Sequence, residues 1–228
     1  MTMNDLQKEL FEVLKANGAE LMGVADIEGI IDTDMKRGIS MVLHIPVEVV
    51  EQLRDHPTEE TQAAYAAFRP RMEELVNAGA EFLKSKGYNT VTGMIGDKPI
   101  PNKIVATRAG IGWVGKNNIV VTKEFGSAIR LGTILTDAPL EADEPITESQ
   151  CGACDLCVRN CPAKALTGKL WEPGLAFGEL HSIDLCRGYA KERAEKDPYY
   201  ANIGMCGKCY AVCTYTQAYH NRVKKENA

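Results

Sequence analysis

The sequence predicts an α+β protein in which a helix-covered sheet is followed by a small cysteine-rich module. Two observations carry this prediction. Helical and strand patterns alternate along the first part of the chain, and all eight cysteines lie at or after position 151. Alternating helices and strands favour a sheet covered by helices. We therefore predict two domains, 1–145 and 146–228, with the acidic, proline-containing stretch 138–150 as the linker between them.

Local patterns place the individual elements. Leu6, Leu10 and Leu14 recur at helical spacing, and Asn17-Gly18 follows as a stop signal, so we predict a helix over 4–17. A second helix, over 59–86, contains Pro70, which is expected to kink or divide it. On similar grounds we expect strands at about 20–25, 39–45, 88–92, 118–122 and 128–135, and a helix-like segment at 103–109.

Composition limits the classes of function. The chain has 228 residues, a formal net charge of -5 and a pI near 5.5, which does not favour a nucleic-acid surface. No apolar run approaches the roughly 20 residues that span a bilayer. The N-terminal residues lack the pattern of a signal peptide. We therefore expect a cytoplasmic protein with no membrane partner.

The cysteines fall into two groups with the spacing of iron–sulfur ligands. The first group reads C-x2-C-x2-C-x3-C-P and ends at Pro162, where we expect a helix to begin. The second keeps C-x2-C-x3-C over 206–213 and takes its remaining ligand from Cys186. We predict two 4Fe-4S clusters bound by Cys151, Cys154, Cys157, Cys161, Cys186, Cys206, Cys209 and Cys213.

The crossed pairing of two-cluster ferredoxins assigns four thiols to each cluster. The fourth cysteine of each run then binds the cluster of the other run, so the two clusters lie close together and electrons can pass between them. The first cysteine set is Cys151, Cys154, Cys157 and Cys213. The second cysteine set is Cys161, Cys186, Cys206 and Cys209.

Two other uses of the cysteines compete with this interpretation. Structural disulfides are typical of exported proteins, and no export signal is found in this sequence. Two tetrahedral zinc sites would also use four thiolates each. Zinc sites usually combine paired C-x2-C knuckles, whereas a run of four cysteines ending in Cys-Pro is typical of iron–sulfur proteins. The spacing favours iron and sulfur over zinc.

A glycine-rich segment precedes the cysteines. Gly110, Gly112 and Gly115 match the G-x-G-x-x-G spacing of dinucleotide-binding loops. That motif requires a strand before it and an acidic residue after it, and the sequence indicates neither. The alternative is a structural turn, because glycines permit sharp turns and close backbone approach.

This segment also carries a resemblance to a known family. Three runs, together with the double cysteine motif, resemble epoxyqueuosine reductase: Ala109-Gly-Ile-Gly-Trp-Val-Gly-Lys-Asn117, Glu124-Phe-Gly-Ser127 and Leu131-Gly-Thr-Ile-Leu-Thr-Asp137. The resemblance covers roughly residues 88–216. It implies a nitroreductase-like, cobalamin-binding domain followed by a ferredoxin-like two-cluster module, as in the reductive dehalogenases.

The resemblance implies roles for several residues. The clusters would pass single electrons to a cobalamin, whose reduced cobalt attacks or reduces the substrate. Gly110, Gly112 and Gly115 would let the backbone approach the corrinoid, Trp113 would pack on it, and Lys116 would meet an anionic group. The alternatives are ordinary core packing for Trp113 and a solvated charge for Lys116.

Three departures from the family pattern bear on function. The family's proposed proton donor is an aspartate three residues before a proline, but that position here is Gly96, and Asp97 is one residue late. Asp97 is therefore only a candidate catalytic acid. Thr214 stands where a proline commonly follows the last cysteine. The chain also ends at Ala228 without the C-terminal helical repeats of many relatives, so we expect tRNA not to be its substrate.

These observations support two functional hypotheses. The first is an oxidoreductase that receives electrons from a redox partner protein and acts on an unidentified small-molecule substrate. The second is a non-enzymatic, ferredoxin-like electron carrier without a corrinoid. The position of Asp97 favours the carrier, whereas the segment Gly110–Lys116 favours a cofactor pocket.

Overall fold

The computed structural model describes residues 4–200 and 205–226, and it divides the chain into two compact units. The first unit comprises Met1–Leu43, Arg69–Gly112 and Arg130–Thr147. The second comprises His44–Phe68, Trp113–Ile129 and Glu148–Ala228. Both units are discontinuous in sequence, so the second combines the cysteine-rich region with two earlier segments. These units do not test which parts of the chain fold independently, so the division into domains 1–145 and 146–228 stays a prediction.

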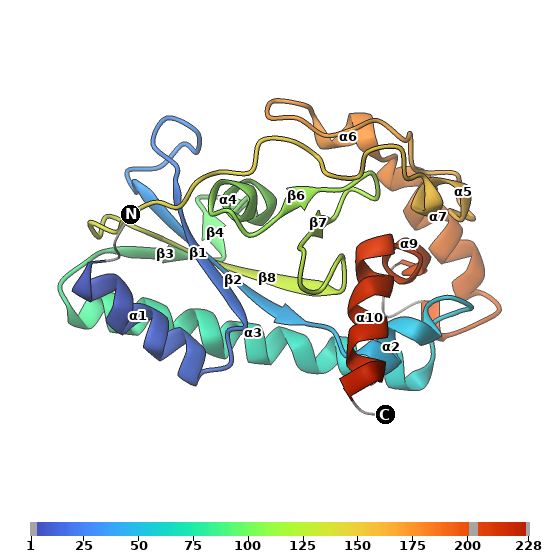
Figure 1. Ribbon diagram of the computed structural model, residues 1–228, viewed down its shortest axis with the longest axis horizontal. Coiled ribbons are helices and arrows are strands. Elements are labelled where there is room, and N and C mark those ends of the chain that lie inside the picture. The colour runs from blue at the N-terminus through green and yellow to red at the C-terminus, as the bar shows by residue number, and fades with distance from the viewer. Residues whose placement is uncertain (1–3, 201–204, 227–228) are drawn as a thin grey trace. The chain divides into compact units, whose positions relative to one another are not determined.

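A four-stranded sheet in the order β1-β2-β8-β3 is the centre of the first unit (Figure 1). β1 pairs with β2, and β3 with β8, both antiparallel. A short hairpin, β4–β5, and a helix, α4, complete the unit together with α1 and most of α3. The bounds are α1 Asp5–Ala16, β1 Leu21–Asp26, β2 Arg37–His44, α3 Glu59–Ser85, β3 Thr90–Thr92, β4 Met94–Ile95, β5 Lys98–Pro99, α4 Asn102–Arg108 and β8 Ile129–Thr136.

Helices cover both faces of this sheet (Figure 1). On one face, a Cβ added at Gly132 of β8 would meet Met72 and Val76 of α3 at 2.4 and 2.8 Å. On the other face, a Cβ at Gly38 of β2 would lie 2.7 Å from Val105 of α4. Small residues at these points let the helices pack closely on the strands. The result is a layered, mixed helix and sheet fold, as the sequence predicts.

The second unit consists of short helices and one small hairpin. The hairpin pairs β6 with β7, antiparallel, and α10 is its longest helix that lies wholly within the unit. Residues 138–150 contain no helix or strand, as expected for a linker. The bounds are α2 Val47–Gln52, β6 Trp113–Val114, β7 Val120–Val121, α5 Leu156–Arg159, α6 Phe177–Leu180, α7 Ile183–Ala194, α9 Lys208–Ala211 and α10 Thr214–Glu226.

The long periodic elements were predicted correctly. The expected helix 4–17 is α1, whose first turn is capped by Asn4 accepting a hydrogen bond from the Gln7 N–H. Leu10 and Leu14 are fully buried, as their helical spacing predicts. Pro70 does not divide the second helix, because α3 continues through that residue, and the alternative of a kink there stays a prediction. Within the described residues, no helix is both long and apolar enough to cross a membrane.

The helix expected at Pro162 is also absent from the described residues. The chain forms a turn there, in which the Lys164 N–H donates to the Cys161 carbonyl at 3.1 Å. Lys164 has φ 49°, a left-handed conformation that cannot continue a right-handed helix. The turn, rather than a helix, carries the chain onward from Cys161.

Candidate functional site

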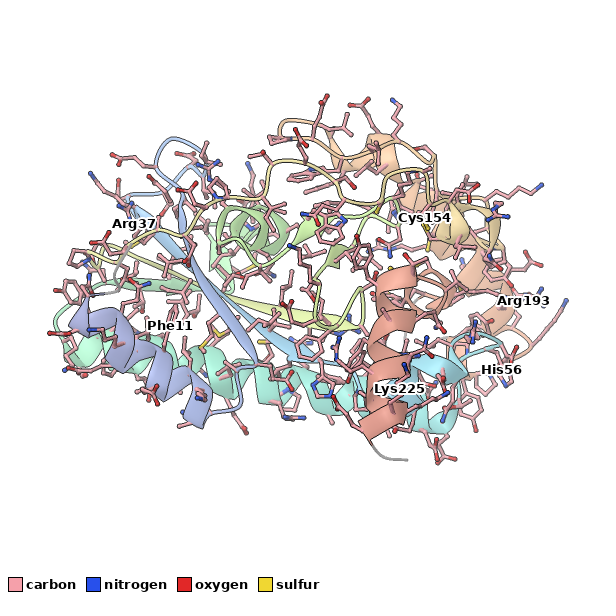
Figure 2. The ribbon with its side chains drawn as sticks, in the orientation of Figure 1. Phe11, Arg37, His56, Cys154, Arg193 and Lys225 are labelled. Atoms are coloured by element: carbon pink, nitrogen blue, oxygen red, sulfur yellow. The ribbon has the colours of Figure 1, made fainter. Side chains whose placement is uncertain are left out.

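The first cysteine set surrounds one small hollow in the second unit. All four of its thiols, Cys151, Cys154, Cys157 and Cys213, line that hollow, although Cys213 lies more than 50 positions from the others. Lys116, Asn117, Thr214 and Tyr215 line it as well. Figure 2 labels Cys154, which lies in the loop before α5. The fold thus brings together the four residues that the crossed pairing assigns to one cluster.

The chemistry of this set fits a cationic inorganic core. Burial, followed by the proximity of Cys151, Cys213 and Cys154, raises the pKa of Cys157 to about 12. Such thiols do not ionise at neutral pH unless a positive group compensates the thiolate charge, and a metal centre supplies that compensation.

The thiols are not arranged as the shell of a single ion. In the part of the chain that the structure describes, no group of three or more His, Cys, Asp or Glu side chains could hold one metal ion. The ligands of a cubane bind separate irons at its corners, so their sulfurs need not converge on a point. None of the eight cysteines, all of which lie in the described residues, forms a disulfide.

The second cysteine set also gathers in space. Burial raises the pKa of Cys186, and the thiols of Cys206 and Cys161 raise it further. Burial likewise raises the pKa of Cys209 well above its ordinary value, with Cys206 the largest contributor among the neighbouring thiols. The four members therefore lie within electrostatic reach of one another. Cys157 also acts on Cys209, so the two sets are close together within the second unit.

Polar groups contact individual sulfurs. The Ala165 N–H donates to the Cys161 Sγ at 3.3 Å. The Cys154 Sγ lies 3.9 Å from the Thr214 Oγ1. Thr214 occupies the position where the family pattern commonly has proline. Hydrogen bonds to cluster sulfurs are among the factors that set reduction potentials. Ala165 lies four residues after Cys161, and Thr214 directly follows Cys213.

Lys116 does not behave as a solvated charge. Its side chain is buried, with 8% of the residue exposed, and its Nζ donates to the Gly152 and Cys154 carbonyls at 2.8 and 3.0 Å. These carbonyls belong to the loop that carries the first three cysteines. Lys116 therefore fixes this loop from a segment more than 30 residues earlier in the chain.

Asn117 contacts the second cysteine set, whereas the adjacent Lys116 contacts the first. Its Nδ2 donates to the Ser127 Oγ at 2.8 Å and, with a longer contact of 3.4 Å, to the Cys209 carbonyl. The Ser127 N–H in turn donates to the Oγ1 of Thr216 at 2.9 Å, near the start of α10. Sequence reasoning did not identify these three polar residues, all of which are buried. Asn117 and Ser127 each lie at the end of a run that carries the family resemblance, whereas Thr216 lies in no such run.

Gly126 makes the closest approach in this network. It adopts φ 62°, and a Cβ at this position would lie 2.2 Å from the Thr216 backbone nitrogen. Only glycine fits such a contact without movement of the backbone. Because α10 begins directly after Cys213, this contact fixes the helix that follows the fourth ligand of the first set.

Three of the residues that the resemblance assigns to a corrinoid lie against the protein itself: Gly110, Trp113 and Gly115. A Cβ at Gly110 would lie 2.9 Å from the Glu144 carbonyl oxygen, and one at Gly115 would lie 2.7 Å from Val121. Gly115 opens the turn of the β6–β7 hairpin, as the structural-turn interpretation predicts. Trp113 is fully buried and packs edge-on against Tyr215, with 4.8 Å between ring centroids. Its Nε1 has no hydrogen-bond partner in the described residues. The corrinoid role of this segment, Gly112 included, remains a prediction.

Asp97 lies at the tip of the β4–β5 hairpin. Ile95 pairs with Lys98, so Gly96 and Asp97 form a two-residue turn, with Gly96 at φ 58°. Asp97 is exposed and belongs to the first unit, and its role as a catalytic acid remains a prediction. Lys103 of the same unit is a titratable group that sequence reasoning missed. Burial lowers its pKa to about 8, so it exchanges protons near neutral pH.

Comparisons with known proteins identify the class of fold. No protein-family model matches the chain. The fold resembles that of the catabolic reductive dehalogenase NpRdhA bound to 3-bromo-4-hydroxybenzoic acid, with a TM-score of 0.70 over 95% of this chain and 33% of that one, at 18% identity. It also resembles epoxyqueuosine reductase solved with a tRNA-Tyr epoxyqueuosine-modified stem loop, with a TM-score of 0.63 over 94% of this chain and 66% of that one, at 24% identity. The protein thus has the mixed helix and sheet fold common to these reductases.

Sequence similarity identifies the family within that class. The chain is 33% identical to the epoxyqueuosine reductase of Bacillus anthracis over 144 residues, 60% of this chain and 35% of the relative. It is 33% identical to that of Lactococcus garvieae over 164 residues, 69% of this chain and 43% of the relative. The chain therefore spans less than half the length of these curated relatives. These similarities support an epoxyqueuosine reductase-like family, and they confirm the resemblance seen in the sequence.

The expectation that tRNA is not a partner is wrong, and the argument from net charge does not support it. An epoxyqueuosine reductase of the same fold has been solved with a modified tRNA stem loop, and the aligned region covers 94% of this chain. Net charge describes the whole chain, whereas phosphate contacts depend on local groups of lysine and arginine. An overall charge of -5 therefore does not exclude a nucleic-acid partner.

Proposed function

We propose that this chain is an iron–sulfur oxidoreductase that passes electrons through two 4Fe-4S clusters to a substrate-side acceptor. The first cysteine set would hold one cluster and the second cysteine set the other. When bound, the clusters supply single-electron transfer at low potential. The protein's own contribution is to hold the eight thiols, limit the access of water and fix the charges around each cluster.

The gathering of the first cysteine set around one hollow is the observation that carries this proposal. Spacing alone assigns three ligands of one run to one cluster, but it does not require Cys213 to join them. Cys213 lines the same hollow as Cys151, Cys154 and Cys157, as the crossed pairing requires.

We propose cobalamin as the acceptor on the substrate side. This proposal is supported by the shared fold of a reductive dehalogenase whose structure is described as suggesting a mechanism for B12-dependent dehalogenation. That likeness, at 18% identity, concerns fold, and the contacts of Gly110 and Gly115 lie within the protein. Cobalamin binding therefore requires a direct measurement.

The substrate class that the relatives support is an epoxyqueuosine-modified tRNA, since the curated relatives are epoxyqueuosine reductases. The structure of such a reductase with a modified stem loop gives the size of the first ligand to test. Because the relatives are enzymes, the alternative of a non-enzymatic electron carrier is not favoured.

Anaerobic reconstitution tests the cluster proposal. The purified full chain is incubated with iron and sulfide, desalted, and analysed for both elements and by EPR spectroscopy after reduction. Two cubanes require about eight irons and eight sulfides per chain. Two zinc ions per chain without acid-labile sulfide would overturn the proposal.

Cobalamin and tRNA are tested separately on the reconstituted protein. An absorption titration with cobalamin is expected to saturate at about one equivalent at micromolar concentration. A modified tRNA stem loop incubated with the cobalamin-loaded protein and a chemical reductant is expected to lose its epoxide, which mass spectrometry detects as the loss of one oxygen atom. If the clusters load but cobalamin does not bind, the proposed electron transfer through the clusters stands and cobalamin is rejected as the acceptor.

A further inference from the structure

Lys116 combines burial, a positive charge and direct contact with the first ligand loop. It lines the hollow of the first cysteine set, and its Nζ is within hydrogen-bond distance of the Gly152 and Cys154 carbonyls. Both acceptors are neutral carbonyls. In the part of the chain that the structure describes, no carboxylate is among the polar contacts of Lys116. The ammonium charge therefore has no fixed protein anion as its partner among these contacts.

A buried charge without a counter-charge is costly. Hydrogen bonds to carbonyls offset part of the desolvation of an ammonium group, but an anion offsets far more. A cubane with four thiolate ligands carries net negative charge, and it becomes more negative by one unit when it accepts an electron. The hollow beside Lys116 is where the proposed function puts such an anion.

We propose that Lys116 is a positioning residue whose charge raises the reduction potential of the cluster held by the first cysteine set. This inference rests on the proposed function. Its two carbonyl contacts hold the Cys151–Cys157 loop in place, and its charge stabilises the reduced cluster more than the oxidised one. Because the ammonium is buried, solvent and salt screen this effect only weakly.

The redox step balances without any further group. One electron enters from a reduced donor protein and converts the oxidised cluster to its reduced form. The same electron leaves for the next acceptor, and the cluster returns to its oxidised form. Lys116 takes no part in covalent chemistry. It changes only the relative free energies of the two oxidation states.

Two substitutions separate the positioning contacts from the charge. Lys116→Gln removes the charge and retains an N–H donor for the loop carbonyls, whereas Lys116→Met removes both. Lys116→Arg restores the charge in a longer side chain. Lys123→Gln is the matched control, because Lys123 belongs to the same Trp113–Ile129 segment but is exposed.

The measurement is an EPR-monitored redox titration of the reconstituted full chain, with iron and sulfide analysis of each variant. Lys116→Gln is expected to keep about eight irons and to lower the reduction equilibrium constant of one cluster about tenfold, a shift of about 59 mV for one electron. In Lys116→Gln the potential of the other cluster is expected to stay near its wild-type value. In Lys123→Gln and Lys116→Arg both potentials are expected to stay near their wild-type values. Lys116→Met is expected to show the same shift and, in addition, partial loss of one cluster.

Each alternative outcome has a definite meaning. Full loading of Lys116→Gln with both potentials unchanged would overturn the inference and leave the proposed function intact. A wild-type chain without acid-labile sulfide would overturn both. An equal shift in Lys123→Gln would assign the effect to overall charge and reject the specific role of Lys116. If Lys116→Gln does not load, normal loading with a wild-type potential in Lys116→Arg supports the charge role, and failure of that rescue overturns it.

Discussion

The two cysteine sets use the same ligands in different electrostatic surroundings. Beside the first set lies the buried ammonium of Lys116, which is tied to the loop carbonyls. In the second set burial raises the thiol pKa values, and two cations partly oppose that rise. Arg187, which is exposed, acts on Cys186, and Lys208, which is half-exposed, acts on Cys206. Exposed charges are screened by water and salt, whereas buried charges are screened much less. Identical ligand chemistry can therefore give two different potentials within one small unit.

Two adjacent residues connect these surroundings to the rest of the unit. Lys116 contacts the loop of the first set, and Asn117 contacts the Cys209 carbonyl of the second. The first contributes a charge, and the second contributes only neutral hydrogen bonds. Neighbouring positions of one turn can therefore serve separate purposes, one for stability and one for the reduction potential.

Removing ligands gives the largest expected effect and tests the pairing itself. Cys213→Ala and Cys154→Ala are expected to lose the same cluster, although they belong to different sequence runs. Cys209→Ala and Cys186→Ala are expected to lose the other. Each variant should retain about four of about eight irons, and the EPR spectrum identifies which cluster remains. If Cys213→Ala matched Cys209→Ala instead, the crossed pairing would be rejected.

Gly126→Ala is expected to destabilise the helix that follows the first set. The substitution combines a left-handed φ of 62° with a Cβ only 2.2 Å from the Thr216 nitrogen. Strain and overpacking together should cost about 3 kcal/mol or more. This corresponds to a fall in Tm of roughly 6–12 °C for a chain of this size, measured by thermal unfolding of the reconstituted protein.

Gly174→Ala is the matched control for that experiment. Gly174 also has a left-handed φ, 89°, but a Cβ there would meet nothing within 4 Å. Only the backbone strain remains, so its expected cost is about 1 kcal/mol. Equal falls in Tm for the two variants would show that the close approach to Thr216 contributes nothing to stability.

Asn117→Ala is expected to lower stability more than it changes either potential. It removes the hydrogen bond to Ser127 and leaves that buried hydroxyl without its donor, at a cost of about 1–2 kcal/mol. Because no charge is removed, both potentials should move less than the one affected by Lys116→Gln. Asn160→Ala is the control, since Asn160 is exposed and its side-chain amide donates to the Leu156 carbonyl, within its own helical turn, at 2.9 Å. A potential shift as large as that of Lys116→Gln would contradict this division of roles.

A smaller effect is expected in the first unit, at Lys103. Burial lowers its pKa to about 8, so its ammonium loses its proton as the pH rises through about 8. Amine-reactive labelling of Lys103, followed by peptide mass spectrometry, should therefore increase with a midpoint near pH 8. Lys103→Arg should lack the labelled peptide. A midpoint above pH 10 would show that burial does not perturb this group.

The sequence predicted the periodic elements and the ligand residues better than it predicted their surroundings. The helix α1 and the strands β2 and β8 follow from local patterns of apolar residues. Of the two expectations at Pro70, division of the helix is excluded, because α3 continues through it. The turn after Pro162 was not predicted, because the left-handed conformation of Lys164 overrode the local rule that a proline suits the first turn of a helix.

By itself, the sequence determined the number and spacing of the thiols and indicated the resemblance to epoxyqueuosine reductase. The covalent chain keeps the closely spaced thiols of each run together, because neighbours along a short loop cannot move far apart. Only the tertiary structure decided that Cys213 lines a hollow with Cys151, that Lys116 lines the same hollow, and that Gly126 must be small. Each of these facts joins segments far apart in the chain, and packing rather than local geometry determines such contacts.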